Sequence, residues 1–103
     1  MRILIVEDEP QAADRLESLI REIRPGVELV GKLDSIKQSV RWFKENPPVD
    51  LVLMDIQLAD GLSFAIFEQI EVKSPVIFTT AYNGYALKAF KVNSIDYILK
   101  PVD

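Results

Sequence analysis

The chain has 103 residues, of which 49% are hydrophobic, and its formal net charge at neutral pH is −4. That length supports one hydrophobic core, so we expect a single domain spanning residues 1–103. The sequence contains no cysteine and no histidine, which excludes disulfides, thiolate chemistry and the usual general base. Lysines and arginines are spread thinly, which argues against direct nucleic-acid binding. Any chemistry therefore rests on carboxylates, lysine and hydroxyl groups.

Apolar runs in this sequence are short. The first covers residues 3–6 and is followed at once by acidic residues, so it cannot serve as the core of a signal peptide. No other apolar run is long enough to cross a bilayer. We expect a cytoplasmic protein that makes no contact with the membrane.

The first predicted strand is the apolar run at residues 3–6. Apolar residues from Ala12 to Ile23 then recur at helical spacing, and the pair at residues 25–26, Pro-Gly, is a helix stop. The second predicted strand, residues 27–33, alternates apolar with polar residues, a pattern typical of a half-exposed strand at a sheet edge.

A second helix is predicted from Ile36 to Phe43, with the preceding pair Asp34-Ser35 as its cap. The continuously apolar run at residues 51–54 predicts a central strand, buried on both faces. A turn at residues 60–61, Asp-Gly, then leads into a third helix. This helix is predicted from the helical spacing of Leu62, Ile66 and Ile70.

Residues 76–78 form another continuously apolar run, predicted to be the fourth strand and central, like the first and third. A short fourth helix is predicted around residues 86–90, and residues 95–99 form the fifth strand. Strands that alternate with helices indicate an α/β fold. We expect a doubly wound, five-stranded parallel sheet of flavodoxin-like topology, with strand order 2-1-3-4-5.

Polar residues stand where four of these strands end. Glu7 and Asp8 follow the first strand, Asp55 the third, Thr80 the fourth and Lys100 the fifth. Any one of them could mark only the place where an apolar run stops. Four coincidences at one edge of a sheet favour a site, because ligands of open α/β sheets bind outside the carboxyl ends of the strands.

Close carboxylates need a compensating cation. Each close pair repels by roughly 4 kcal/mol at an effective dielectric constant near 20. Oxygen ligands select Mg²⁺, whose coordination shell substrate phosphate oxygens often complete. Asp55 would then be the nucleophile that forms an acyl phosphate, while Lys100 and Thr80 stabilise the charge on the phosphoryl group.

The motifs at residues 6–9, 53–57, 79–81 and 99–101 together resemble those of the receiver domains of bacterial response regulators. The match runs over essentially the whole chain. Residues 80–97 resemble, more specifically, receivers attached to LytTR-type DNA-binding domains.

The resemblance implies a metal site and a phosphorylation site. Asp55 would be phosphorylated by a sensor histidine kinase. Asp8, Asp55 and the Gln57 carbonyl would bind Mg²⁺ directly, and Glu7 would act mostly through a bound water. No enzymatic activity on external substrates is implied, only self-phosphorylation from a phosphohistidine donor and autodephosphorylation.

The resemblance also implies a switch. Thr80 would move toward the phosphoryl group, the Tyr97 ring would follow it, and Lys100 would pair with the phosphate, with a cis peptide bond before Pro101. Phosphorylation would promote a homodimer through the surface of residues 84–99. The candidate contact residues on that surface are Tyr85, Lys88, Lys91, Asn93 and Asp96.

Members of the family continue with a fifth helix after the motif at residues 99–101, whereas this sequence ends at Asp103. We therefore expect the last helix to be missing, one face of the sheet to be half uncovered, and the chain to be a fragment of a longer response regulator. The rest would carry a LytTR-type DNA-binding domain, through which alone the protein would contact DNA and regulate transcription.

Three other functions compete with the receiver. A haloacid-dehalogenase-type phosphatase also uses an aspartyl nucleophile, but its second acidic position is occupied here by Gln57. A degenerate receiver that serves only as a scaffold would not need the complete set of acids with Thr80 and Lys100. A flavin or dinucleotide carrier would share the fold, yet no glycine-rich fingerprint follows the first strand.

Overall fold

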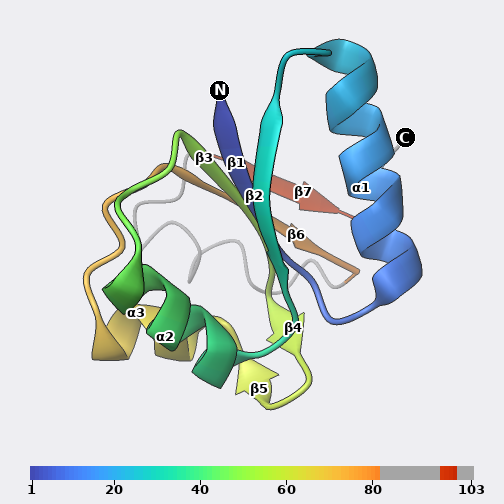
Figure 1. The fold of residues 1–103 in the computed structure, drawn as a ribbon. Coiled ribbons are helices and arrows are strands. Elements are labelled where there is room, and N and C mark those ends of the chain that lie inside the picture. The colour runs from blue at the N-terminus through green and yellow to red at the C-terminus, as the bar shows by residue number, and fades with distance from the viewer. Residues whose placement is uncertain (82–95, 100–103) are drawn as a thin grey trace.

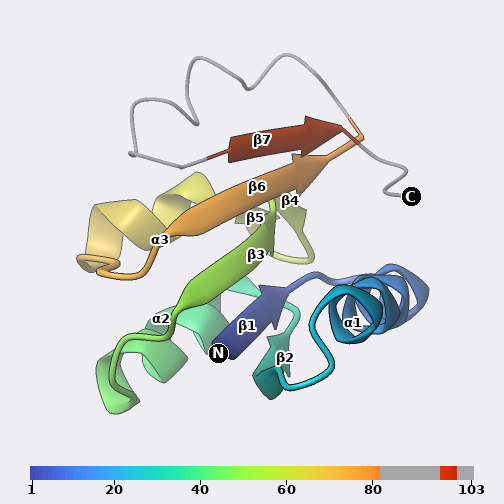
Figure 2. The ribbon, with the colours of Figure 1, turned by 90° about the horizontal axis from the view of Figure 1, so that it is seen from above.

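The computed structural model describes residues 1–81 and the backbone of residues 96–99. Its main sheet is built from β1 (Arg2–Val6), β2 (Glu28–Leu33), β3 (Leu51–Asp55), β6 (Val76–Thr80) and β7 (Asp96–Leu99). Figure 1 shows the whole fold, and Figure 2 shows the strands side by side in the order β2-β1-β3-β6-β7, in which every neighbouring pair is parallel. Counting these five strands alone, the order is 2-1-3-4-5, so the predicted topology is confirmed.

Helices cover both faces of this sheet. Figure 2 shows α1 (Pro10–Ile23) on one face and α2 (Ile36–Glu45) with α3 (Phe64–Gln69) on the other. This is the doubly wound arrangement that the alternation of strands and helices predicted. The helix predicted around residues 86–90 lies outside the described residues.

Alternate residues of the central strands face the two helical layers. On the side of α2 and α3, a larger core contains Leu4, Val6, Leu33, Ile36, Val40, Val49, Val52, Met54, Ile56, Leu58, Phe64, Ile66, Val76 and Phe78. On the side of α1, a smaller core contains Ile3, Ile5, Ala13, Leu16, Val27 and Leu53. Because both faces of β1 and β3 are buried in this way, their sequences are continuously apolar.

Helix starts follow local sequence signals. Pro10 occupies the first turn of α1, where its missing N–H costs nothing. Ser35 caps α2 as predicted, since its Oγ accepts a hydrogen bond from the Gln38 amide at 3.1 Å. At the other end of α1 the apolar stripe runs past the sheet, and Ile23 is 77% exposed.

The segment after β3 differs from the prediction. Leu62 does not start a helix: it belongs to a small antiparallel hairpin of β4 (Gln57–Leu58) and β5 (Gly61–Leu62). The third helix begins only at Phe64, and Ile70 follows its last residue. The residues between Asp55 and α3 therefore form an ordered hairpin close to the strand end that carries the candidate site.

Candidate functional site

Three carboxylates meet at the carboxyl edge of the sheet. Glu7, Asp8 and Asp55 each contribute an oxygen atom, and these atoms lie within 4.8 Å of one another. The parallel pairing of β1 with β3 brings them together, since Val6 pairs with Met54 and the next residue of each strand is acidic. The structure thus gathers the acidic residues that the strand ends predicted.

The cluster combines buried and exposed groups. Glu7 is 4% exposed and Asp55 is 6% exposed, whereas Asp8 is open to solvent. Like charges at this separation repel strongly, and partial burial weakens the screening by water. An oxygen-only set of donors with one solvent-facing member fits a hard, partly hydrated cation such as Mg²⁺.

Backbone amides hold two of these carboxylates. The Glu9 amide donates a hydrogen bond to Glu7 Oε2 at 3.2 Å, and the Gln57 amide donates to Asp55 Oδ1 at 3.3 Å. Each donor is the amide two residues after the acidic residue, so each carboxylate points toward the loop that follows its strand. The side chain of Gln57 is exposed, and its backbone belongs to β4.

Thr80 ends β6, the strand beside β3. Asp55 pairs with Thr79 in the sheet, so Thr80 lies one residue beyond the partner of the candidate acceptor. Both threonines are buried, at 1% and 0% exposure. Thr79 therefore belongs to the interior of the domain.

The remaining residues predicted for the site and the switch either have only their backbone described or lie outside the described residues. Tyr97 lies within β7, so its backbone is placed beside β6, but its side chain is outside the described part of the chain. Lys100 lies outside the described residues, as do Pro101 and the expected contact residues Tyr85, Lys88, Lys91 and Asn93. Asp96 begins β7, again with only its backbone described.

Asp60 is a residue whose role sequence reasoning missed. It was expected only to form a turn, yet its Oδ1 and Oδ2 accept hydrogen bonds from the amides of Ile36 and Lys37 at 2.7 and 3.1 Å. These bonds, the one from Ile36 foremost, hold the pKa of the Asp60 carboxyl below its usual value. No local signal reveals a contact between residues 24 positions apart.

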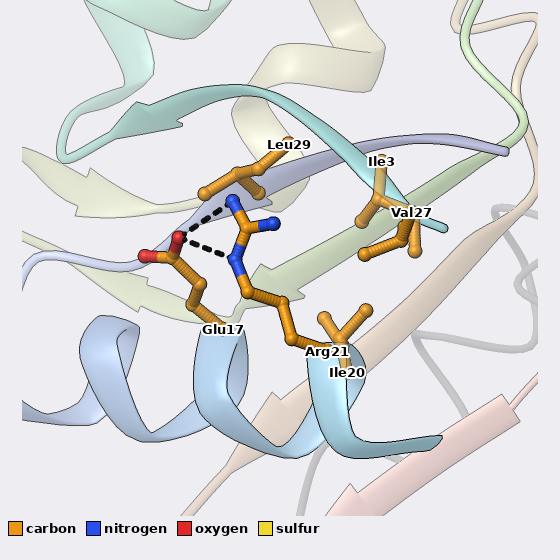
Figure 3. Close-up of a pocket in the computed structure, with 6 residues that line it drawn as sticks. All are labelled: Ile3, Glu17, Ile20, Arg21, Val27 and Leu29. Atoms are coloured by element: carbon orange, nitrogen blue, oxygen red, sulfur yellow. Dashed lines mark hydrogen bonds and ion pairs between the residues drawn. The ribbon is translucent and has the colours of Figure 1, made fainter. Parts of the chain in front are cut away.

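A second group of charges lies on the α1 side, away from the carboxylate cluster. Lys32 on β2 pairs with Asp14 at 2.7 Å and with Glu17. Figure 3 shows the neighbouring pair, in which Arg21 lies 2.9 Å from Glu17. The bond to Asp14 and then that to Glu17 raise the pKa of Lys32. Lys32 and then Arg21 lower the pKa of Glu17.

Figure 3 also shows the depression between α1 and the edge of the sheet, beside the Arg21 side chain. Its walls are Ile3, Glu17, Ile20, Arg21, Val27 and Leu29, and it has no room for a water molecule. This region ties α1 to β2 and is no candidate for a ligand site.

The response regulator receiver domain family matches residues 3–103. The sensory transduction protein LytT of Enterococcus faecalis is 42% identical over 106 residues, and LytT of Bacillus anthracis is 40% identical over 106 residues. Each alignment covers 100% of this chain but only 43% and 42% of the relative.

The chain is also similar to solved structures of response regulators. The response regulatory domain of protein mrkE from Klebsiella pneumoniae is 34% identical, with a TM-score of 0.83, and the match covers 100% of this chain and 85% of that one. A LuxR-family response regulator from Aurantimonas is 30% identical with a TM-score of 0.80, covering 99% and 75%.

Among the described residues, no helix is long and apolar enough to cross a bilayer. The fold, the strand-end carboxylates and the family match agree with one another and favour the receiver over the phosphatase and the carrier. The match to LytT relatives also confirms the resemblance to the LytTR-type subgroup. This chain belongs to the response regulator receiver domain family of two-component systems.

Proposed function

We propose that this chain is a phosphorylation switch in which Asp55 accepts a phosphoryl group from a sensor histidine kinase. The observation that carries the proposal is the cluster of Glu7, Asp8 and Asp55, whose oxygens lie within 4.8 Å of one another at the carboxyl edge of the sheet. Asp55 is the member that ends a central strand and is buried against the hairpin after β3. Membership of the receiver family supports the same acceptor.

The residues that would hold Mg²⁺ are Asp8, Asp55 and the backbone carbonyl of Gln57, with Glu7 acting mostly through a bound water. Bound there, the ion would neutralise negative charge on the carboxylates and on the phosphoryl oxygens. The oxygen-only chemistry of this donor set fits such an ion. It also explains why three acidic side chains stand so close at this edge of the sheet.

In the transfer step, an Asp55 carboxylate oxygen attacks the phosphorus of a phosphohistidine. The new O–P bond forms as the P–N bond of the donor breaks, and the departing imidazole nitrogen takes up a proton. Thr80 and Lys100 donate hydrogen bonds to phosphoryl oxygens and so stabilise the charge on the transferred group. Water later hydrolyses the acyl phosphate, which resets the switch.

The signal would pass from Asp55 to the surface of residues 84–99. Thr80 moves toward the phosphoryl group, Tyr97 follows it, and the altered surface favours a homodimer. The chain spans less than half the length of its LytT relatives. We propose that residues 1–103 are the receiver part of a longer cytoplasmic response regulator, whose remainder carries the last helix and a LytTR-type DNA-binding domain for transcription regulation.

The test is the intact mass of the protein after incubation with Mg²⁺ and acetyl phosphate. Parent protein should gain one phosphoryl adduct, while Asp55→Asn and a metal-free sample should gain none. Asp50→Asn is the matched control, since Asp50 precedes the same strand at its opposite end and accepts a hydrogen bond from the Arg2 amide. It should be phosphorylated like the parent.

The outcome also separates the rival functions. An adduct that persists in Asp55→Asn would place the acceptor elsewhere and contradict the proposal. Parent protein that is folded by circular dichroism, yet gains no adduct, would instead be a scaffold without phosphoryl transfer.

A further inference from the structure

The hairpin of β4 and β5 follows the candidate acceptor directly. Ile56 joins it to β3, and its amide donates to the Thr79 carbonyl at 3.1 Å while its own carbonyl accepts from Ser63 at 2.7 Å. These bonds fix the base of the hairpin to the sheet. Gln57, whose carbonyl belongs to the proposed metal site, is the first residue of β4 and pairs with Leu62.

The hairpin is too small to be stable by itself. Each strand has two residues, and isolated two-stranded hairpins are marginal in water. Its conformation must therefore depend on contacts with other elements. Leu58 supplies one of them, since it is 7% exposed within the larger core.

Asp60 supplies a polar contact, at the tip of the hairpin. Its two carboxylate oxygens accept hydrogen bonds from Ile36 and Lys37, the first residues of α2. The first amides of a helix have no partner inside the helix, so a carboxylate there is a strong acceptor. The next residue, Gly61, lies close to the first residue of α2, because a Cβ added at Gly61 would be 3.3 Å from Ile36 Cδ1.

The start of α2 thus has two caps of different origin. Ser35 is local and accepts from Gln38, whereas Asp60 comes from the hairpin and accepts from Ile36 and Lys37. Loss of either cap weakens the same end of the same helix. Only the loss of Asp60 also frees the tip of the hairpin from its anchor.

We propose that Asp60 is a positioning residue for the metal and phosphorylation site, which clamps the hairpin to α2 and so fixes the Gln57 carbonyl and the backbone beside Asp55. This inference rests on the proposed function. Partners of a metal ligand that do not touch the metal commonly set its orientation and its affinity. Asp60 does so through the backbone of the hairpin, with no contact to the ion itself.

The experiment compares Asp60→Ala with Ser35→Ala. Mg²⁺ affinity is measured by isothermal titration calorimetry, and hydrogen exchange of the amides of residues 57–62 is measured by NMR in metal-free protein. We expect Asp60→Ala to raise the Mg²⁺ dissociation constant about tenfold and to speed exchange in the hairpin. Ser35→Ala should leave both near the parent values, although it removes a cap from the same helix.

Asp60→Asn serves as the conservative variant, because it retains one carbonyl oxygen for the α2 amides. Its dissociation constant should fall between those of parent and Asp60→Ala, and it provides a second measurement if Asp60→Ala unfolds. Equal shifts in Asp60→Ala and Ser35→Ala would overturn the inference, as would a parent-like Mg²⁺ affinity in Asp60→Ala. Failure of the parent itself to bind Mg²⁺ would instead overturn the proposed metal site.

Discussion

The two faces of the sheet are held in different ways. The face under α2 and α3 contains the larger core, with the rings of Phe64 and Phe67 packed 5.2 and 5.8 Å from Phe78. The face under α1 contains the smaller, aliphatic core. The polar contacts differ too. Asp60 bonds to backbone amides of α2, whereas Lys32 pairs with two carboxylates of α1, the exposed Asp14 and the half-buried Glu17.

This difference bears on the hairpin beside the candidate site, which is attached to the α2 side of the sheet. The hairpin that carries Gln57 is joined to α2 by a carboxylate on backbone amides and by a buried leucine. On the other face the polar contacts are ion pairs in water, which are weak and screened by salt. The α2 and α3 face should therefore dominate both the stability of the domain and the geometry of the site.

The largest expected effect is the loss of an aromatic ring from the larger core. Phe78 is fully buried, so Phe78→Ala should lower the free energy of unfolding by about 3 to 5 kcal/mol. Leu16→Ala, in the smaller core, should cost about 2 to 3 kcal/mol. Urea unfolding measures both, and an equal or greater cost for Leu16→Ala would break the comparison.

Gly61→Ala should have the next largest effect. Gly61 has a φ of 136°, a conformation that side chains rarely adopt, so the substitution should cost about 1 to 3 kcal/mol of stability. Gly26→Ala is the matched control, since an added Cβ there meets nothing within 4 Å. Thermal unfolding should show a lower midpoint for Gly61→Ala alone. A lower midpoint for Gly26→Ala as well would mean that the effect is not particular to the hairpin.

The contribution of Asp60 should depend on pH. Hydrogen bonds from Ile36 and Lys37 lower its folded pKa below the ordinary value of 3.8, so the carboxylate stabilises the fold above that value. The stabilisation is lost as the pH falls through the folded pKa, because the carboxyl is then protonated in both states. At neutral pH, Asp60→Ala should cost about 1 kcal/mol or less, given its exposure.

Denaturant titrations across acidic and neutral pH would measure this difference. The gap between parent and Asp60→Ala should close in acid, whereas the cost of Ser35→Ala, which removes a hydroxyl cap, should not change with pH. A gap that stays constant into strong acid would show that the charge of Asp60 does not stabilise α2.

The smallest effect is expected on the α1 face. Lys32→Gln removes the ion pairs with Asp14 and Glu17, and because all three groups are in contact with water the loss of stability should be slight. It should shrink further as salt is added, since screening acts on exposed pairs. Unfolding at low and high ionic strength measures this. A cost that does not change with salt would mean that the Lys32 stem contributes through packing.

The sequence predicted the sheet well because its signals are local. Continuous apolar runs reveal strands buried on both faces, and the alternation between residues 27 and 33 reveals an edge strand. The hairpin of β4 and β5 was not predicted, and the reason is physical. Strands of two residues carry no periodicity, so Leu62 was assigned to the helix that in fact begins at Phe64.

The candidate site, too, has one part that the sequence could predict and another part that it could not. Parallel topology alone is enough to predict that Glu7, Asp8 and Asp55 converge, because the carboxyl ends of neighbouring strands share one edge. The bond from Asp60 to α2 depends on how the hairpin packs, which no run of residues encodes. The roles of Lys100 and Tyr97 depend on side chains outside the described residues and stay predictions.

The interior position of β1 has a consequence for how the molecule folds. β1 is the first strand of the sequence, yet it pairs with both β2 and β3. Parallel partners can be joined only by long crossovers, so contacts between distant residues must form before these pairings stabilise the chain. A nascent chain that has not yet placed β3 would carry Glu7 and Asp8 without Asp55. Formation of the carboxylate cluster would therefore report that the centre of the sheet is assembled.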